Sequence, residues 1–315
     1  MLVDQRLALP RKSYLIDYFN DLDRYLQVGP PVYFVEQGLD LTHREAQQEV
    51  CGRFSTCSDY SIGNILEAER KRSESSYLAE PPSIWLDDFF QWLNPALSSC
   101  CRIKKRDPNT FCEPEDSEFI CKACFEDKEN EWNITMEGLP QGKEFMNYLD
   151  HWIKSPANED CPLGGKAGYS TAISIGEIKK TGENGNEGEV EQFVKASHFR
   201  TYHTPLKNQN DFINALASAK RISADLSQNT NGGKIFPYSI FYVYFEQYAS
   251  IVTTTRAVLA LALAAVLAVT AIILGSWRTG FVVVITVFMI AMNVLVSQFH
   301  FLIQVHPAEI AYLLD

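Results

Sequence analysis

The eight cysteines are the residues of this chain with the most obvious chemistry, and all of them fall between Cys51 and Cys161. An even number of cysteines gathered in one stretch predicts a set of structural disulfides. Cys121 and Cys124 also have the C-x-x-C spacing of zinc sites and of thioredoxin-like redox pairs. The sequence has no second C-x-x-C and no histidine pair nearby, and this pair follows a charged loop. We therefore expect disulfides, and neither a metal site nor redox chemistry.

Carboxylates and histidines suggest little catalysis. Asp87 and Asp88 are adjacent, so on a helix their side chains point in different directions, and acids in a first helical turn stabilise the helix dipole. His198 and His203 lie five residues apart on an expected strand, which places them on opposite faces and disfavours joint metal binding. The chain has no G-x-S-x-G, H-E-x-x-H or Walker motif. We predict no catalytic residue, no cofactor and no enzyme activity.

One N-x-S/T sequon, at Asn133, lies in a polar loop beside the cysteines. It predicts a glycan on Asn133 in a compartment where glycosylation occurs. Together with the cysteines, it indicates that the residues ahead of the apolar C-terminal region face an oxidising lumen or the cell exterior.

The distribution of charged residues divides the chain into a charged region and an almost uncharged region. Of its 28 basic and 39 acidic residues, only Arg278, Glu309 and Asp315 follow Arg256. Two uncharged runs, 257–276 and 281–299, are each about as long as the ~20 residues that a helix needs to cross a bilayer. Four residues separate the runs. We therefore expect an antiparallel transmembrane hairpin over 251–303, after a domain over 1–250 and before a tail over 304–315.

The first domain is acidic, with 27 basic and 37 acidic residues before position 257, which disfavours nucleic acid as a partner. Its N-terminus lacks the apolar core of a signal peptide. A luminal domain of this size that precedes its first membrane span needs an upstream signal or span, so the sequence is expected to be part of a larger membrane protein.

Apolar spacing predicts two strand-helix-strand units, which together form the βαββαβ pattern of an α+β, ferredoxin-like sandwich. In the first unit, Leu15, Phe19, Leu22 and Leu26 stripe a helix that begins after Ser13 and ends at Gly29. The strands of this unit are Arg6–Leu9 and Val32–Val35. The second unit has strands over 193–202 and 234–240 and a helix over 212–226.

A cysteine-rich insertion over about 38–174 separates the two units. Helices are expected within it over 61–69, 83–93 and 143–153. Beyond the insertion, residues 179–191 are expected to form a flexible loop. Trp85, Phe89 and Trp92 recur along the second helix. This spacing could serve lipid contact, but it is more typical of a helix packed into a core.

Several segments of the sequence resemble the Niemann-Pick type C sterol transporter family, relatives of Patched and of the RND permeases. The resemblance covers roughly Asp4 to Leu295, the family's last large luminal domain and the two spans after it. The segments that carry it are Leu9-Pro-Arg-Lys-Ser-Tyr-Leu-Ile-Asp-Tyr-Phe19, Tyr25-Leu-Gln-Val-Gly-Pro-Pro-Val-Tyr-Phe-Val35, Ser83-Ile-Trp-Leu-Asp-Asp-Phe-Phe-Gln-Trp92, Ser99-Cys-Cys-Arg102, Thr201-Tyr-His-Thr204 and Phe236-Pro-Tyr-Ser-Ile-Phe-Tyr-Val243.

The resemblance implies an integral protein of the lysosomal or vacuolar membrane, with its main domain luminal, that moves a sterol such as cholesterol or ergosterol. It also implies a disulfide pairing, which sequence alone leaves open among 105 arrangements. The implied pairs are Cys51 with Cys57, Cys100 with Cys161, Cys101 with Cys124, and Cys112 with Cys121.

The chain departs from the family in what it lacks. The sterol-binding domain, the middle luminal domain and the sterol-sensing spans have no counterpart here, and neither apolar run carries the ionisable group that ion coupling requires. After about Val296 the resemblance ends. We expect one luminal lobe and two spans of a sterol transporter. Its expected partners are sterol, the membrane, and the family's middle luminal domain and sterol-sensing spans. A membrane-anchored, receptor-like ectodomain of the Patched type is the alternative.

Overall fold

The computed structural model describes residues 13–26, 28–113, 116–126, 136, 138–179 and 190–305. The chain forms two compact units, one of them Leu26–Tyr242, which we call the lobe, and the other Met1–Tyr25 with Val243–Asp315. The expected strand Arg6–Leu9, the sequon at Asn133 and the tail from 306 onward lie outside the described residues.

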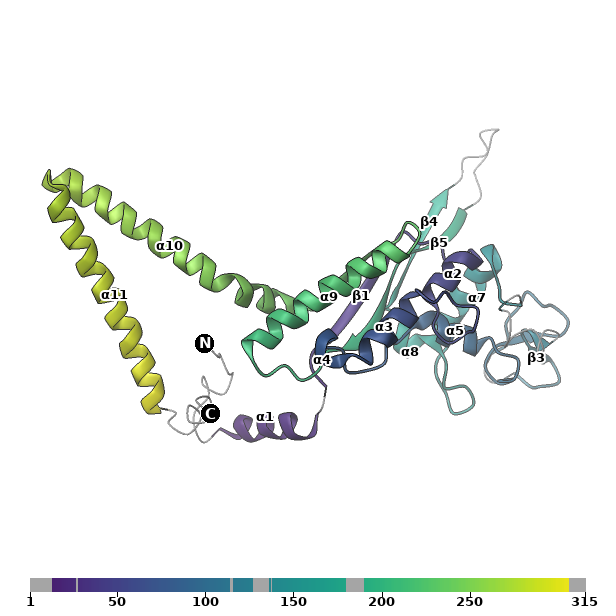
Figure 1. Ribbon diagram of the computed structural model, residues 1–315. Coiled ribbons are helices and arrows are strands. Elements are labelled where there is room, and N and C mark those ends of the chain that lie inside the picture. Colours follow the sequence, from purple (N-terminus) through teal and green to yellow (C-terminus); the bar gives the residue numbers. More distant parts are fainter. Residues whose placement is uncertain are drawn as a thin grey trace. The chain divides into compact units, whose positions relative to one another are not determined.

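A four-stranded sheet forms the centre of the lobe, in the order β4-β5-β1-β6 with every neighbouring pair antiparallel (Figure 1). Its strands are β1 (Pro31–Gln37), β4 (Ile173–Lys179), β5 (Val190–Tyr202) and β6 (Lys234–Tyr238). In β1 every second residue is buried, as alternation on a half-covered sheet requires. Phe34 faces Phe199 across the β1–β5 pair, and α9 (Gln209–Asn229) packs on β6.

The second expected strand-helix-strand unit is present in the lobe, with one added strand, but the first unit was wrong because its helix, over 14–25, belongs to the other compact unit. Strands 193–202 and 234–240 and helix 212–226 correspond to β5, β6 and α9. Strand β4 was not expected, and the predicted loop over 179–191 was wrong at its ends, because Lys179 closes β4 and Val190 opens β5. Strand β1 lies in the middle of the sheet between β5 and β6.

The insertion between β1 and β4 is mainly helical. Ser61 caps α3 by accepting a hydrogen bond from the Asn64 amide at 3.2 Å, as expected of a helix that begins there. A second, two-stranded sheet carries the disulfide-rich loops. The elements of the insertion are α2 (Arg44–Val50), α3 (Ile62–Arg70), α4 (Ser73–Ser76), α5 (Trp85–Trp92), β2 (Arg102–Lys104), β3 (Cys121–Ala123), α7 (Gly142–Lys154) and α8 (Gly165–Tyr169).

Aromatic side chains form the core of the insertion. Trp85 and Phe89 are fully buried and Trp92 is 2% exposed, so the prediction that they are core residues is confirmed. The Phe89 ring lies 5.5 Å from that of Phe145 and 5.3 Å from that of Trp152, both on α7. These contacts join α5 to α7.

Three helices lie outside the lobe. Helix α1 (Tyr14–Tyr25) begins after Ser13, as predicted, and α10 (Tyr242–Leu274) and α11 (Trp277–Val305) are both long and apolar enough to cross a membrane. The expected four-residue connection at 277–280 was wrong. The turn is Gly275–Ser276, where Gly275 has a φ of +60° that glycine adopts without strain, and Trp277 already belongs to α11.

Candidate functional site

Four disulfides hold the insertion together, and no described cysteine is free. They are Cys51–Cys57, Cys100–Cys161, Cys101–Cys124 and Cys112–Cys121, the same four pairs that the family resemblance implies. Adjacent Cys100 and Cys101 bond to different segments, one beyond α7 and the other beyond β3. The loops around β2 and β3 are thereby fixed at several points.

The sulfurs that approach an acidic residue do not form a metal site. Cys112, Asp116 and Cys121 lie close enough for their ligand atoms to share an ion. Because Cys112 and Cys121 are bonded to each other, neither offers a thiolate, and the Asp116 carboxylate accepts a hydrogen bond from the Glu113 amide at 3.0 Å. This cluster stabilises the loop.

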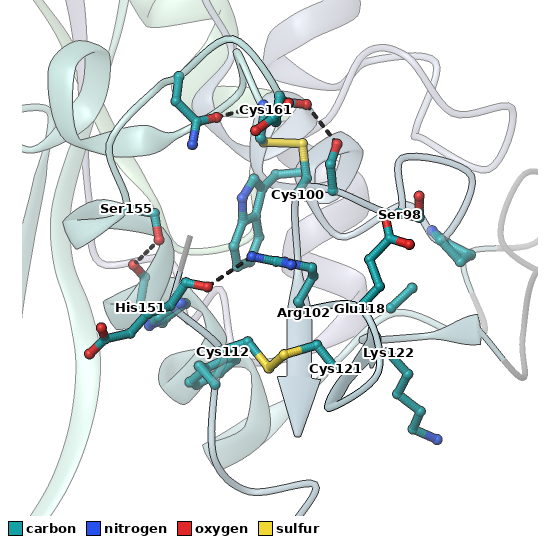
Figure 2. A pocket seen from close by; sticks show the side chains of 18 of the residues that line it. Ser98, Cys100, Arg102, Cys112, Glu118, Cys121, Lys122, His151, Ser155 and Cys161 are labelled. Atoms are coloured by element: carbon teal, nitrogen blue, oxygen red, sulfur yellow. Dashed lines mark hydrogen bonds between the residues drawn. A yellow bond between two sulfur atoms is a disulfide. The ribbon is translucent and has the colours of Figure 1, made fainter. Parts of the chain in front are cut away.

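A groove of about 900 Å³ lies between the β2–β3 hairpin and the end of α7 (Figure 2). Its wall includes the Cys100–Cys161 and Cys112–Cys121 bridges and His151, whose ring stacks on Phe111 at 3.9 Å. Much of the remaining lining is charged, with bases and acids mixed. Figure 2 shows Arg102, Glu118 and Lys122 around this opening.

The chemistry of this groove does not suit a sterol. Arg102 donates to the carbonyl oxygens of Asp116 and Glu113 at 2.9 and 2.8 Å, and Lys105 donates to that of Glu118 at 2.9 Å. These cations therefore stabilise the loop backbone. A sterol is apolar except for its hydroxyl, and burying it against charged groups would cost their hydration.

The carboxylates that sequence singled out take structural roles. Asp87 is buried and accepts hydrogen bonds from the Gly52 amide at 3.1 Å with both carboxylate oxygens. Burial raises the pKa of Asp87 to about 6 against the lowering effect of this hydrogen bond. Asp88 pairs with Arg53 at 2.9 Å and accepts a hydrogen bond from the Tyr169 hydroxyl. The two acids thus have separate partners and do not form a paired acid-base site.

His203 contacts Tyr242, the last residue of the lobe. Its ring is fully buried, with Nδ1 2.9 Å from the Tyr77 carbonyl oxygen and Nε2 2.9 Å from the Tyr242 hydroxyl. A carbonyl oxygen only accepts, so Nδ1 carries the proton and Nε2 accepts from Tyr242. Burial lowers the pKa of His203 to about 4, which keeps the ring neutral.

His203 also contacts the segment around Gly29. The Gly29 amide donates to the His203 carbonyl oxygen at 2.8 Å, and a Cβ on Gly29 would lie 2.2 Å from the Thr204 carbonyl oxygen. Only glycine fits there. The two ends of the lobe, near Gly29 and Tyr242, therefore both contact His203. The role of His203 is to hold these segments together, and it is not a metal ligand.

His198 lies apart from these contacts. It is half-buried on β5, and its ring meets the Tyr33 ring edge-on at 5.0 Å. Burial and the nearby Arg200 charge lower the pKa of His198. The structure does not bring His198 and His203 together.

Sequence reasoning missed a buried acid, Glu36. It is 1% exposed, and its carboxylate accepts from the Leu39 amide at 2.8 Å and from the Ser197 hydroxyl at 3.3 Å. Burial raises the pKa of Glu36 to about 6, and these hydrogen bonds offset only part of that effect. Alternation from Val32 and Phe34 would have pointed Glu36 inward had the strand been extended beyond Val35.

The arrangement defines a class of protein. A disulfide-bonded lobe without a catalytic constellation among its described residues continues directly into a pair of apolar helices. This class is a membrane protein with a large domain outside the bilayer.

Known proteins of this class match the chain. It is 34% identical over 300 residues to NPC intracellular cholesterol transporter 1 of Sus scrofa, covering 92% of the chain and 22% of that protein. It is 33% identical over 318 residues to NPC1-like intracellular cholesterol transporter 1 of Homo sapiens, covering 92% of the chain and 23% of that protein. It is 30% identical over 285 residues to NPC intracellular cholesterol transporter 1 homolog 1 of Caenorhabditis elegans, covering 86% of the chain and 20% of that protein.

No family model matches the chain. Over about nine tenths of its length the chain is similar to these members of the Niemann-Pick type C transporter family. It spans about one fifth of their length.

Proposed function

We propose that this chain is one lobe and two spans of a sterol transporter in the lysosomal or vacuolar membrane. The observation that carries the proposal is the match to cholesterol transporters over 92% of the chain, which runs through the lobe and into the apolar helices. The four disulfides and the sequon at Asn133 support a luminal position for the lobe. The lobe acts by holding and shielding sterol, and it is not an enzyme.

The fold supports a ferredoxin-like lobe. Strand order β4-β5-β1-β6, with the insertion between β1 and β4 and α9 between β5 and β6, follows a βαββαβ sandwich in which the first crossover has grown into the insertion. In this arrangement helices cover one sheet face. The other face, which includes Tyr33 and His198, remains for a neighbouring lobe of the same transporter.

In the proposed arrangement the lobe supplies only one wall of the sterol passage. The groove beside Cys112–Cys121 is polar, so the sterol passage has to be formed with the family's middle luminal domain. A photoreactive sterol should therefore label the lobe when this segment stands within a longer transporter. Absence of labelled peptides from 26–242 would contradict the passage.

The isolated chain provides the complementary test. Titrated with radiolabelled cholesterol in detergent, it should show no saturable high-affinity binding, because one wall of the passage is missing. Saturable binding would contradict a shared passage while leaving the family assignment intact.

A further inference from the structure

A small groove lies where α10 ends and α11 begins. A Cβ on Gly280 would lie 3.2 Å from Thr270 Oγ1 and 3.3 Å from the Ala271 amide nitrogen, so the two helices touch close to their connection. Beside this contact is an opening of about 400 Å³ lined by Leu267, Trp277, Arg278 and Phe281. Trp277 is 68% exposed and Phe281 59% exposed, so the side chains face outward around it.

The polarity of the groove is graded along the helices. Arg278 and Trp277 are at the start of α11, and both helices are long and apolar enough to cross a membrane, which would place these two residues at its surface. Leu267 lies about 10 Å before the end of α10 and Phe281 about 6 Å into α11, at 1.5 Å of rise per residue. The charged end of the groove therefore lies at headgroup depth and its apolar end at acyl-chain depth. Tryptophan and arginine are the residue types that bind at this interface.

Charge identifies the occupant. Arg278 is the one charged residue between Arg256 and Glu309, so this stretch of sequence supplies no carboxylate to neutralise it. A guanidinium binds phosphate through two parallel N–H donors. A zwitterionic headgroup brings its own cation to the site, whereas an anionic headgroup adds net attraction to an uncompensated positive charge.

We propose that this groove binds an anionic phospholipid, with the phosphate on Arg278 and one acyl chain against Leu267 and Phe281. Trp277 packs beside the glycerol region. The site lies at the membrane face to which the α10–α11 turn belongs. It rests on the two helices spanning the bilayer and not on sterol transport.

Trp277 is a built-in probe, because the other four tryptophans of the chain all precede residue 153. The full chain is placed in phosphatidylcholine nanodiscs that contain increasing fractions of dibrominated phosphatidylserine or of dibrominated phosphatidylcholine, whose bromines quench nearby indoles. Half-maximal quenching should occur at an about fivefold lower fraction of the serine lipid. The variant W277F should lose the quenched component.

Matched arginine variants decide the proposal. R278Q should abolish the preference for the serine lipid, and R278K, which keeps the charge, should retain part of it. R256Q removes an exposed arginine at the opposite end of the apolar run and should leave the preference unchanged. Equal quenching by both lipids in the natural chain, a preference that survives R278Q, or an equal loss in R256Q would each overturn the site.

Discussion

At the scale of single residues, buried acids make the free energy of unfolding of the lobe depend on pH. The pKa of Glu36 is raised to about 6 by burial, above its value in an unfolded chain. The folded state therefore holds the proton more tightly, and the stability that Glu36 contributes is present below pH 4.5 and lost as pH rises through 6. An acidic compartment suits such a residue.

Substitution E36Q should remove this dependence. The amide is neutral at every pH, so the variant should gain about 2 kcal/mol relative to the natural chain between pH 4.5 and pH 7. Thermal unfolding of both proteins across this range measures the difference. Glu118, an exposed acid, gives the matched control E118Q, which should follow the natural chain. A difference between E36Q and the natural chain that does not change with pH would contradict the assignment.

His203 has the opposite pH dependence. Its pKa is lowered to about 4, so its contribution is present above pH 6.5 and lost as pH falls through 4, because the unfolded chain takes up the proton first. H203F should cost about 2 to 4 kcal/mol at pH 7, since the Tyr242 hydroxyl loses its acceptor and both hydrogen bonds of the His203 ring are lost.

The cost of H203F should shrink as pH falls toward 4. Chemical unfolding monitored at several pH values checks this trend. H198F, at the half-buried histidine on β5, should cost less than H203F at every pH. Equal costs for the two variants at pH 7 would show that His203 does not hold these segments together.

At the scale of elements, α3 packs on the Cys51–Cys57 loop through two glycines. A Cβ on Gly63 would lie 2.8 Å from the Gly52 Cα and 2.9 Å from its amide nitrogen, and both neighbours are backbone atoms that cannot rotate away. G63A should therefore destabilise the lobe by about 1 to 3 kcal/mol. G168A, on α8 where a Cβ meets nothing within 4 Å, should be neutral. Denaturant midpoints of the two variants make the comparison, and equal midpoints would contradict the close packing.

The disulfides should differ in strength because they close loops of different length. Cys100 and Cys161 are 61 residues apart and Cys112 and Cys121 only 9 apart. On chain entropy alone, replacing the first pair by serine should cost about 4 kcal/mol and the second about 3 kcal/mol. Unfolding of both double variants tests the order, and a larger loss for the shorter loop would contradict it.

Sequence predicted those elements whose pattern is local and regular. The apolar stripe of α9 was sufficient to identify that helix. Strand β4 was missed because Gly176 and Glu177 interrupt its apolar pattern. Gly176 is required by tertiary packing, since a Cβ there would lie 2.8 Å from the Phe193 ring on β5. A constraint imposed by a neighbouring strand leaves no periodic signal in the sequence of β4.

The candidate site was also predicted only in part from the sequence. The eight cysteines alone predicted a set of disulfides. Which partner each of the neighbouring Cys100 and Cys101 bonds to is determined by the folded structure. His203 was noticed as a residue type, and its role was not, because Tyr77 and Tyr242 are distant in sequence and meet only in the folded lobe. The turn at Gly275 was misplaced for a different reason. Trp277 to Gly280 interrupt the apolar run although they form the first turn of α11.

At the scale of the whole molecule, the chain joins a polar, cross-linked lobe to two apolar helices. The proposed luminal position predicts no reactive thiol in the native chain. Maleimide labelling of intact vesicles, and then of vesicles opened with detergent, should modify no cysteine until a reductant is added. Labelling of several cysteines without reductant would contradict an oxidising compartment.

The proposed role of this segment is that of one lobe and two spans of a sterol transporter. It is tested by replacing the matching segment of NPC intracellular cholesterol transporter 1 of Sus scrofa with this chain in cells that lack their own transporter. The chimera should clear stored cholesterol, and a chimera carrying G63A, with a weakened lobe, should clear less. A chimera that is inserted in the membrane with all disulfides formed and leaves the cholesterol in place would contradict this role.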